Sequence, residues 1–172
     1  SLTERVLARS DIREHNLPRD VSSFIGRDDD RAAVAGLLAS TQLLTLVGPG
    51  GVGKTRLALR VASDALDDHP DGVWLVELAP LADAHLVAQA IAQVLGVREQ
   101  PGTPLIDTLC ETLGRTSQLL LLDNCEHLID ACAEVASRLL RTCERLCILA
   151  TSREPLNVGG EVLWRVPPLS VP

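Results

Sequence analysis

The sequence has no methionine and no tyrosine, and its 172 residues include a single lysine, Lys54. Aromatic side chains are almost as scarce, since only Phe24, Trp74 and Trp164 are present. Proteins that bind single strands stack the bases on aromatic side chains, so this scarcity argues against that class of binding. The formal net charge of −7 argues against a broad basic surface for duplex nucleic acid as well. We therefore expect no direct nucleic-acid contact by this domain.

Long apolar runs and paired cysteines are also missing. No apolar run approaches the roughly 20 residues that span a bilayer, and no secretory leader is present, so we expect a cytoplasmic protein without membrane contact. The five cysteines lack CxxC spacing, which favours small, buried, reduced residues over a zinc site. Because the chain lacks a starting methionine and ends in "VPPLSVP", we expect a piece of a longer protein, with a linker or loose helix over 1–15 and one domain over 16–172.

Short apolar runs alternate with segments of helical periodicity along the chain. The expected strands are 42–47, 72–78, 117–123, 146–153 and 161–166, and the expected helices are 28–40, 54–66, 83–96, 103–114 and 128–140. Asp28, Asp83 and Thr103 are the expected N-caps, with Pro104 as a first helical residue and Gly96 as a stop. The run 117–123 does not alternate, which is typical of a strand covered on both faces. The pattern predicts an α/β fold in three layers, with a mainly parallel five-stranded sheet flanked by helices.

Residues 48–55 read "GPGGVGKT", between an expected strand and an expected helix. This stretch fits G-x-x-x-x-G-K-[ST], the phosphate loop of P-loop NTPases, whose backbone amides and lysine hold phosphates. A compact ammonium fits between β- and γ-phosphate oxygens, whereas a planar guanidinium demands a different geometry, which explains the lone Lys54. Thr55 is expected to bind Mg²⁺ through its hydroxyl. The residues predicted to hold the nucleotide here are Gly48, Pro49, Gly50, Gly51, Val52, Gly53, Lys54, Thr55 and Arg56.

Further charged residues follow the expected strands at the same edge of the sheet. Asp123 ends the run "LLLLD" and is the expected partner of Thr55 on Mg²⁺. Many hydrolytic P-loop proteins place an acid directly after this aspartate, but Asn124 stands there and cannot act as a base, so we expect slow hydrolysis. Glu126 is a candidate base for the attacking water, or else a favourable charge at the start of a helix. Arg153 is expected to touch the γ-phosphate and report its presence, or else to be an ordinary surface arginine. The predicted catalytic set is Lys54, Asp123, Glu126 and Arg153.

The single lysine excludes the guanine-reading N-K-x-D or T-K-x-D element of Ras-like GTPases, and the transporter signature LSGGQ is absent. Adenine nucleotide, ATP or ADP, is favoured by this elimination. A catalytic P-loop ATPase or small-molecule kinase is an alternative to a regulatory ATPase. A scaffold that binds no nucleotide is a third reading, which the intact loop argues against.

The ordered set "FIGRDDD", "GPGGVGKT", "LLLLDNCEH" and "LATSREPL", followed by "VPPLS", resembles the NB-ARC module of the STAND class of signal-transduction ATPases. The resemblance is strongest to the version in bacterial LuxR-type and AfsR/SARP-type transcriptional regulators, and it covers about residues 16–172. It implies that Arg27 wraps the adenine and ribose side, together with the three residues before it, and that Pro167 or Pro168 packs near the base. Those three preceding residues are Phe24, Ile25 and Gly26.

The same resemblance implies a molecular switch. ADP would hold the parent protein closed, and exchange for ATP with Mg²⁺ would open it and permit self-association. The implied partners, besides the nucleotide, are other domains of the same chain, namely a winged helix, sensor repeats and a DNA-binding domain. The predicted domain over 16–172 is therefore a P-loop NTPase domain with at most weak ATPase activity.

Overall fold

The computed structural model describes residues 14–19, 27–50 and 52–168. The helices in these parts are α2 (Asp28–Ser40), α3 (Lys54–Asp64), α4 (Leu86–Leu95), α5 (Leu105–Leu113) and α6 (Ile129–Thr142), with 3-10 turns η2 (Leu66–Asp68) and η3 (Cys125–Leu128). The strands are β1 (Leu43–Val47), β2 (Val73–Glu77), β3 (Leu119–Asp123), β4 (Cys147–Ser152) and β5 (Val162–Arg165). Each of the five expected strands is thus present, within one or two residues of its expected ends.

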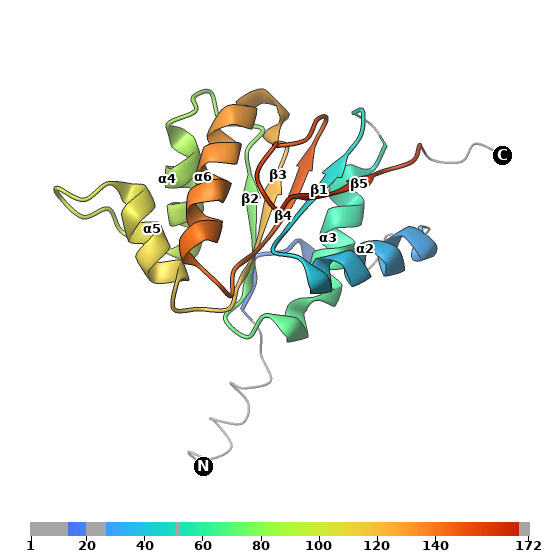
Figure 1. The fold of residues 1–172 in the computed structure, drawn as a ribbon, viewed down its shortest axis with the longest axis horizontal. Helices are drawn as coiled ribbons and strands as arrows, with labels where there is room; N and C mark the ends of the chain where they lie inside the picture. The colour runs from blue at the N-terminus through green and yellow to red at the C-terminus, as the bar shows by residue number, and fades with distance from the viewer. Residues whose placement is uncertain (1–13, 20–26, 51, 169–172) are drawn as a thin grey trace, which may run out of the picture.

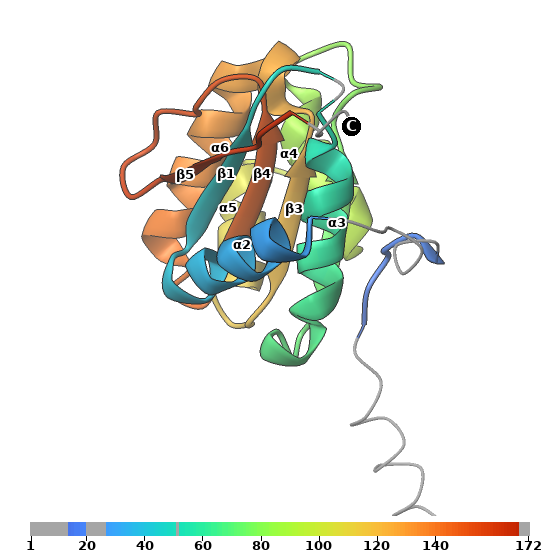
Figure 2. The same cartoon turned by 90° about the vertical axis from the view of Figure 1, so that its right-hand side faces the viewer.

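The strands form one parallel sheet in the order β2-β3-β4-β1-β5. Figure 1 shows α4, α5 and α6 on one side of this sheet and α2 and α3 on the other, and Figure 2 looks onto the side of α2 and α3, which lie in front of the strands. The predicted three-layer α/β architecture is therefore confirmed. Because the strands are parallel, their carboxyl ends meet at one edge, where the connections to the next helices begin.

The core consists of two apolar layers, one on each face of the sheet. On β3, Leu120 and Leu122 pack toward α4, α5 and α6, whereas Leu119 and Leu121 pack toward α2 and α3. All four side chains have no exposed surface. Burying one leucine side chain is worth about 1.5–3 kcal/mol, so a strand apolar on both faces fits only this central position.

The residues expected as N-caps of three helices do not occupy the cap positions in the structure. Asp28 is the first residue of α2 rather than its cap, and Arg27 before it has a left-handed φ of 58°. Asp83 accepts a hydrogen bond from the His85 amide (3.1 Å) in the turn before α4, which begins only at Leu86. Pro104 precedes α5 instead of opening it, so Thr103 is not its N-cap. Gly96, with φ 71°, does end α4 as expected.

Residues 14–16 lie along the outer edge of β2. The Val73 amide donates to the Glu14 carbonyl at 3.0 Å, and His15 forms a parallel bridge with Val73. The Asn16 side chain then bonds the backbone of Leu75 twice, accepting from its amide at 2.6 Å and donating to its carbonyl at 2.9 Å. The boundary expected between residues 15 and 16 therefore falls inside a segment that contacts the sheet.

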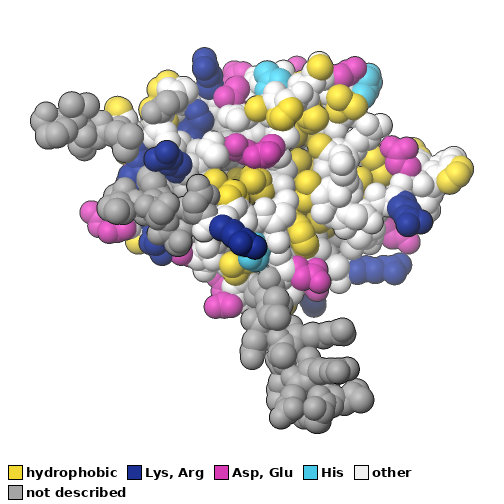
Figure 3. Space-filling model, turned by 180° about the vertical axis from the view of Figure 1, so that it is seen from behind, with side chains coloured by type: hydrophobic (Ala, Val, Ile, Leu, Met, Phe, Trp, Pro, Cys, Tyr) yellow, Lys and Arg dark blue, Asp and Glu magenta, His cyan; other side chains and the backbone are white. Residues whose placement is uncertain are grey.

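The surface carries charges of both signs. Figure 3 shows the face opposite that of Figure 1, where acidic and basic side chains are interspersed around apolar ones. Within the described residues, none of the helices combines the length and the apolar character needed to cross a bilayer. All five cysteines are free thiols, and Cys125, Cys132 and Cys143 are buried.

Candidate functional site

The loop between β1 and α3 lies at the carboxyl edge of the sheet (Figures 1 and 2). Its first residue is tied to β4, because the Gly48 amide donates to the Ser152 carbonyl at 3.2 Å. Gly53 closes the loop with a left-handed φ of 84°, a conformation that favours glycine, and α3 begins at the next residue. At Gly50 a β-carbon would lie 3.0 Å from Nη2 of Arg153, so glycine lets this arginine approach the loop. Gly51 lies outside the described residues, as do Phe24, Ile25 and Gly26.

Lys54 is the buried charge of this site, with 6 % of its surface exposed. Its Nζ donates to the carbonyls of Gly48 at 2.6 Å and Pro49 at 3.1 Å, which leaves one of three N–H groups for another acceptor. Burial lowers the pKa of Lys54, and the positive charge of Arg153 lowers it further, while Glu126 and Asp123 raise it. An ammonium held in this way gains from an added anion, because a phosphate would offset the cost of burying the positive charge.

Asp123, at the end of β3, meets Thr55 at the start of α3. The Thr55 hydroxyl donates to Oδ1 of Asp123 at 2.8 Å, and the carboxylate is 6 % exposed. The sequence predicted this pair as the Mg²⁺ ligands, and the structure brings the two side chains together. A hydroxyl and a carboxylate are the hard oxygen donors that Mg²⁺ prefers.

Thr151 completes this cluster and was missed in the sequence. Its hydroxyl donates to the same Oδ1 of Asp123 at 2.6 Å and accepts from the Asn124 amide at 2.9 Å. The register that pairs Leu122 with Ala150 places the next two residues, Asp123 and Thr151, level on neighbouring strands. A buried threonine near the end of the apolar run 146–151 was the available signal, but its meaning depends on β4 lying beside β3.

The residues after Asp123 turn sharply at the same edge. Asn124 has a left-handed φ of 66°, which asparagine tolerates better than most residues, and it directs the chain into η3. Glu126, in η3, places Oε1 4.0 Å from Nε of Arg153, and its Oε2 is buried without a hydrogen-bond partner among the described residues. Arg153 itself is 66 % exposed. Glu126 and Arg153, two of the predicted catalytic residues, are therefore neighbours beside the loop.

Arg27 contacts the loop from the other side. Its Nη2 donates to the carbonyl of Val52 at 2.6 Å and to that of Pro167 at 2.8 Å. The resemblance placed Arg27 and either Pro167 or Pro168 on the adenine side, and in the structure Arg27 joins the carbonyl of Pro167 to the phosphate loop at Val52. Pro168 and Arg56 are both exposed, the latter on the first turn of α3.

The residues present fit a phosphate group with Mg²⁺. Both hydroxyl contacts of Asp123 fall on Oδ1, so its second oxygen is not used by them. Among the described residues, no group of three or more His, Cys, Asp and Glu side chains could hold a metal by itself. The Thr55 hydroxyl and the Asp123 carboxylate are instead the donors expected where Mg²⁺ is also bound by the oxygens of a phosphate.

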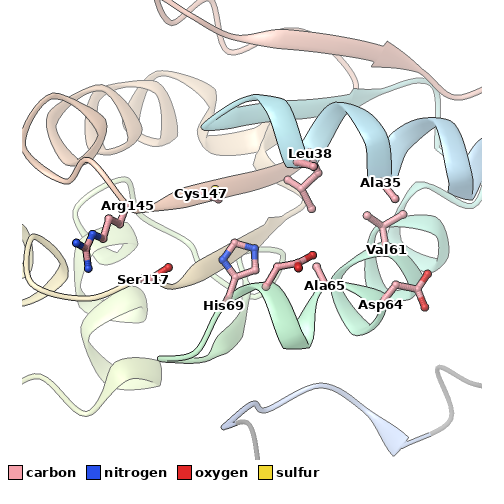
Figure 4. Close-up of a pocket in the computed structure, with 11 residues that line it drawn as sticks. Ala35, Leu38, Val61, Asp64, Ala65, His69, Ser117, Arg145 and Cys147 are labelled. Atoms are coloured by element: carbon pink, nitrogen blue, oxygen red, sulfur yellow. The ribbon is translucent and has the colours of Figure 1, made fainter.

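A separate pocket of about 470 Å³ opens at the opposite edge of the sheet, between the ends of α2 and α3. Figure 4 shows Leu38 and Val61 on its apolar side and His69 reaching into it. Burial lowers the pKa of His69, with the nearby Asp68 carboxylate opposing this shift. None of the phosphate-loop residues lines this pocket, so it is distinct from the site described above.

A family model described as "AAA domain" matches residues 38–158, which include the described loop, Asp123 and Arg153. The chain belongs to the AAA domain family. AAA domains are P-loop ATPase domains, and the loop at residues 48–55 agrees with this family. The family shown is broader than the NB-ARC module expected from the sequence, and that narrower assignment stays a prediction.

Curated relatives are much longer than this AAA domain. An uncharacterized protein of Mycobacterium tuberculosis is 43 % identical over 158 residues, covering 92 % of this chain and 40 % of that protein. A second M. tuberculosis protein, named as a candidate HTH-type transcriptional regulator, is 48 % identical over 135 residues, covering 78 % and 15 %. The regulatory protein AfsR of Streptomyces coelicolor is 33 % identical over 138 residues, covering 68 % and 14 %. The chain thus spans 40 % or less of each of these relatives.

Solved structures share the fold of this AAA domain. A STAND protein with a tetratricopeptide repeat sensor from Pyrococcus horikoshii has a TM-score of 0.58 at 17 % identity, covering 83 % of this chain and 23 % of that one. Drosophila ORC bound to DNA has a TM-score of 0.63 at 15 % identity, covering 86 % and 44 %. At these identities the likeness concerns the fold alone.

Proposed function

We propose that this chain is the ATP- and ADP-binding switch domain of a multidomain transcriptional regulator, with slow ATP hydrolysis. The observation that carries the proposal is the contact between the Thr55 hydroxyl and the Asp123 carboxylate, at 2.8 Å, beside the buried ammonium of Lys54. In P-loop proteins a hydroxyl and an aspartate in this relation hold Mg²⁺, and the lysine holds the β- and γ-phosphates.

Each residue of the site has a distinct role in this proposal. Lys54 would donate its remaining N–H to a phosphate oxygen. The backbone amides of the loop and of the start of α3 would bind the other phosphate oxygens. Mg²⁺, when bound with the nucleotide, would neutralise charge on the β- and γ-phosphates. Thr151 would keep Asp123 in place beside Thr55, because its hydroxyl donates to the same Oδ1. Arg153 would approach the γ-phosphate across Gly50.

Slow hydrolysis follows from the residues around Asp123. Asn124 cannot take a proton from water, and its backbone amide is already committed to Thr151. Glu126 is the remaining candidate base, and its Oε1 already lies 4.0 Å from Nε of Arg153. The site is therefore better suited to holding a nucleotide for a long time than to rapid turnover.

The regulatory part of the proposal rests on the relatives. Two of them are named as regulators and are several times longer than this chain, so other domains are the natural partners of this one. A structure of the Aeropyrum pernix ORC2 protein, with the same fold at a TM-score of 0.54, is described as ADPNP–ADP complexes, which favours adenine nucleotides as the ligands. The NB-ARC assignment, a cytoplasmic location and self-association of the parent protein belong to this proposal too.

Calorimetry with ATP and ADP, with and without Mg²⁺, tests the proposal directly. Lys54→Ala should weaken binding of both nucleotides at least tenfold, since it removes the buried cation that contacts the phosphates. Asp123→Asn should weaken mainly the part of ATP affinity that depends on Mg²⁺. The exposed His85→Asn is a matched control that should bind as the wild type does. Unchanged ATP binding by Lys54→Ala would instead support a scaffold without nucleotide.

Turnover separates the switch from a catalytic enzyme. Kinases commonly run at about 1–100 s⁻¹, and the proposed switch should be far slower. Glu126→Gln should slow single-turnover hydrolysis further without weakening ATP binding, because it removes a candidate base and no phosphate ligand. Steady-state rates within the kinase range, or phosphoryl transfer to a small acceptor, would overturn the switch in favour of a catalytic P-loop enzyme.

A further inference from the structure

Arg27 lies where three segments far apart in the sequence meet. It immediately precedes α2, and its Nη2 donates one hydrogen bond to Val52 in the phosphate loop and one to Pro167 beyond β5. The guanidinium also lies 3.5 Å from the carboxylate of Asp30, and its side chain is only 6 % exposed. A buried, permanently charged group that donates to two backbone carbonyls is held in place, unlike a surface arginine. We call Arg27 and its contacts with Val52 and Pro167 the junction.

The segment that leaves β5 is itself packed against the loop. The Val166 amide donates to the Val47 carbonyl at 2.8 Å, and the Val166 side chain is 2 % exposed. A β-carbon at Gly48 would lie 3.4 Å from the Val166 carbonyl oxygen. The two ends of the junction, Val52 and Pro167, are thus joined both through Arg27 and through this packing.

Holding the Val52 carbonyl fixes the orientation of a phosphate-loop amide. In a trans peptide the carbonyl and the following N–H point in opposite directions, so the Gly53 N–H is aimed away from Arg27. Phosphate loops bind through such amides, which makes the Val52–Gly53 peptide plane a determinant of the binding geometry. Rotation of this plane would break the Arg27–Val52 hydrogen bond and leave Arg27 bound to the Pro167 carbonyl alone, so the link between the two segments would be lost.

We propose that Arg27 is a positioning residue that couples the phosphate loop to the chain segment at Val166 and Pro167, so that nucleotide binding and the position of this segment influence each other. The coupling rests on the proposed nucleotide binding. Because such coupling is reciprocal, displacement of the segment should change nucleotide affinity by the same factor by which the nucleotide resists displacement. Arg27 also has a left-handed φ of 58°, which is uncommon for a residue with a long side chain.

Hydrogen exchange of the full 172-residue chain tests the junction without nucleotide. Arg27→Ala should speed exchange about tenfold or more both at residues 52–54 and at Val166, since both segments lose a charge-assisted hydrogen bond. Arg27→Lys keeps the charge but lacks the guanidinium fork, so it should show the same effect at smaller size and cover the case that Arg27→Ala does not fold.

Arg31→Ala is the matched control. Arg31 lies one turn further along α2 and pairs with Asp64, so its loss should leave both segments at the wild-type exchange rate. A variant of Arg27 that speeds exchange in only one of the segments, or in neither, overturns the junction.

Adding ADP or ATP then tests the coupling. In the wild type, nucleotide should slow exchange at the loop and also at Val166, whereas in Arg27→Lys the slowing at Val166 should be clearly smaller than in the wild type. Equal protection of Val166 in both proteins, or none in the wild type that binds nucleotide, would refute the coupling, since a merely structural Arg27 predicts no such difference. Failure of the wild type to bind either nucleotide counts against the proposed function, while the exchange without nucleotide still decides the junction.

Discussion

Replacing Thr151 with valine should destabilise the domain although the two side chains are nearly isosteric. The hydroxyl donates to the Asp123 carboxylate at 2.6 Å and accepts from the Asn124 amide at 2.9 Å, and the residue has no exposed surface. A hydrogen bond to a charged group contributes about 1.5–3 kcal/mol, and an amide left unpaired costs about 1–3 kcal/mol. Valine returns part of this by burying a methyl group, worth about 1 kcal/mol. We therefore expect a loss of roughly 1.5–5 kcal/mol in the free energy of unfolding.

Urea unfolding followed by circular dichroism measures this loss. With a slope of about 2 kcal/mol per molar urea, the midpoint should fall by roughly 0.8–2.5 M. Thr151→Ser is the control, because it keeps the hydroxyl and deletes only a methyl group, at a cost of about 1 kcal/mol. The same valine variant should lose part of the Mg²⁺-dependent ATP affinity, since Asp123 is then held by Thr55 alone.

The comparison of Thr151→Val with Thr151→Ser tests the role of the Thr151 hydroxyl. If Thr151→Val is no less stable than Thr151→Ser, the hydroxyl does not contribute as a partner of Asp123. If it is less stable but binds Mg²⁺-ATP as the wild type does, Thr151 supports the fold without positioning the carboxylate.

Two further predictions concern pH. Burial lowers the pKa of Lys54 below its ordinary 10.5, so ATP affinity measured by calorimetry should begin to fall at a lower pH than an exposed lysine would give, and flat affinity up to pH 10.5 would contradict this. Burial also lowers the pKa of His69 below 6.5, so the unfolded chain takes up more protons and the free energy of unfolding should fall as the pH drops through 6.5 toward the pKa of the folded state. In urea titrations at several pH values, His69→Asn should flatten this dependence, and an unchanged dependence in this variant would contradict the assignment to His69.

The local part of this site could be predicted from the sequence, and the non-local part could not. The spacing in residues 48–55 specifies the loop by itself, and Asp123 could be placed beside Thr55 because parallel strands end at one edge. Thr151 could not be recognised, since its role requires β4 to lie next to β3, a strand order that no local pattern encodes. The bond from Arg27 to Pro167 spans 140 positions and depends on how α2 begins and β5 ends.

Secondary structure shows the same division. The strands were predictable because a run such as 119–123 is apolar on both faces and has no stable place except inside a parallel sheet. The expected starts of α2 and α4 differ from the observed ones because Asp28 and Asp83 are good N-cap residues in general, yet Arg27 and His85 stand at the cap positions and neither helix has a side-chain cap hydrogen bond. Glu14 and His15 looked like linker because their contacts to β2 are made mostly through the backbone, which carries no sequence signal.

The two hydrogen bonds between the Asn16 side chain and the Leu75 backbone bear on how this protein avoids aggregation through the edge of its sheet. An open outer strand offers a row of unused amides and carbonyls to which a foreign strand can add, and this is a common route into aggregates. The Glu14 carbonyl accepts from the Val73 amide, and the Asn16 carboxamide bonds both the amide and the carbonyl of Leu75. These backbone groups are therefore not available to pair with an added strand. A single asparagine thus blocks the addition of a strand to the β2 edge of the sheet at Leu75.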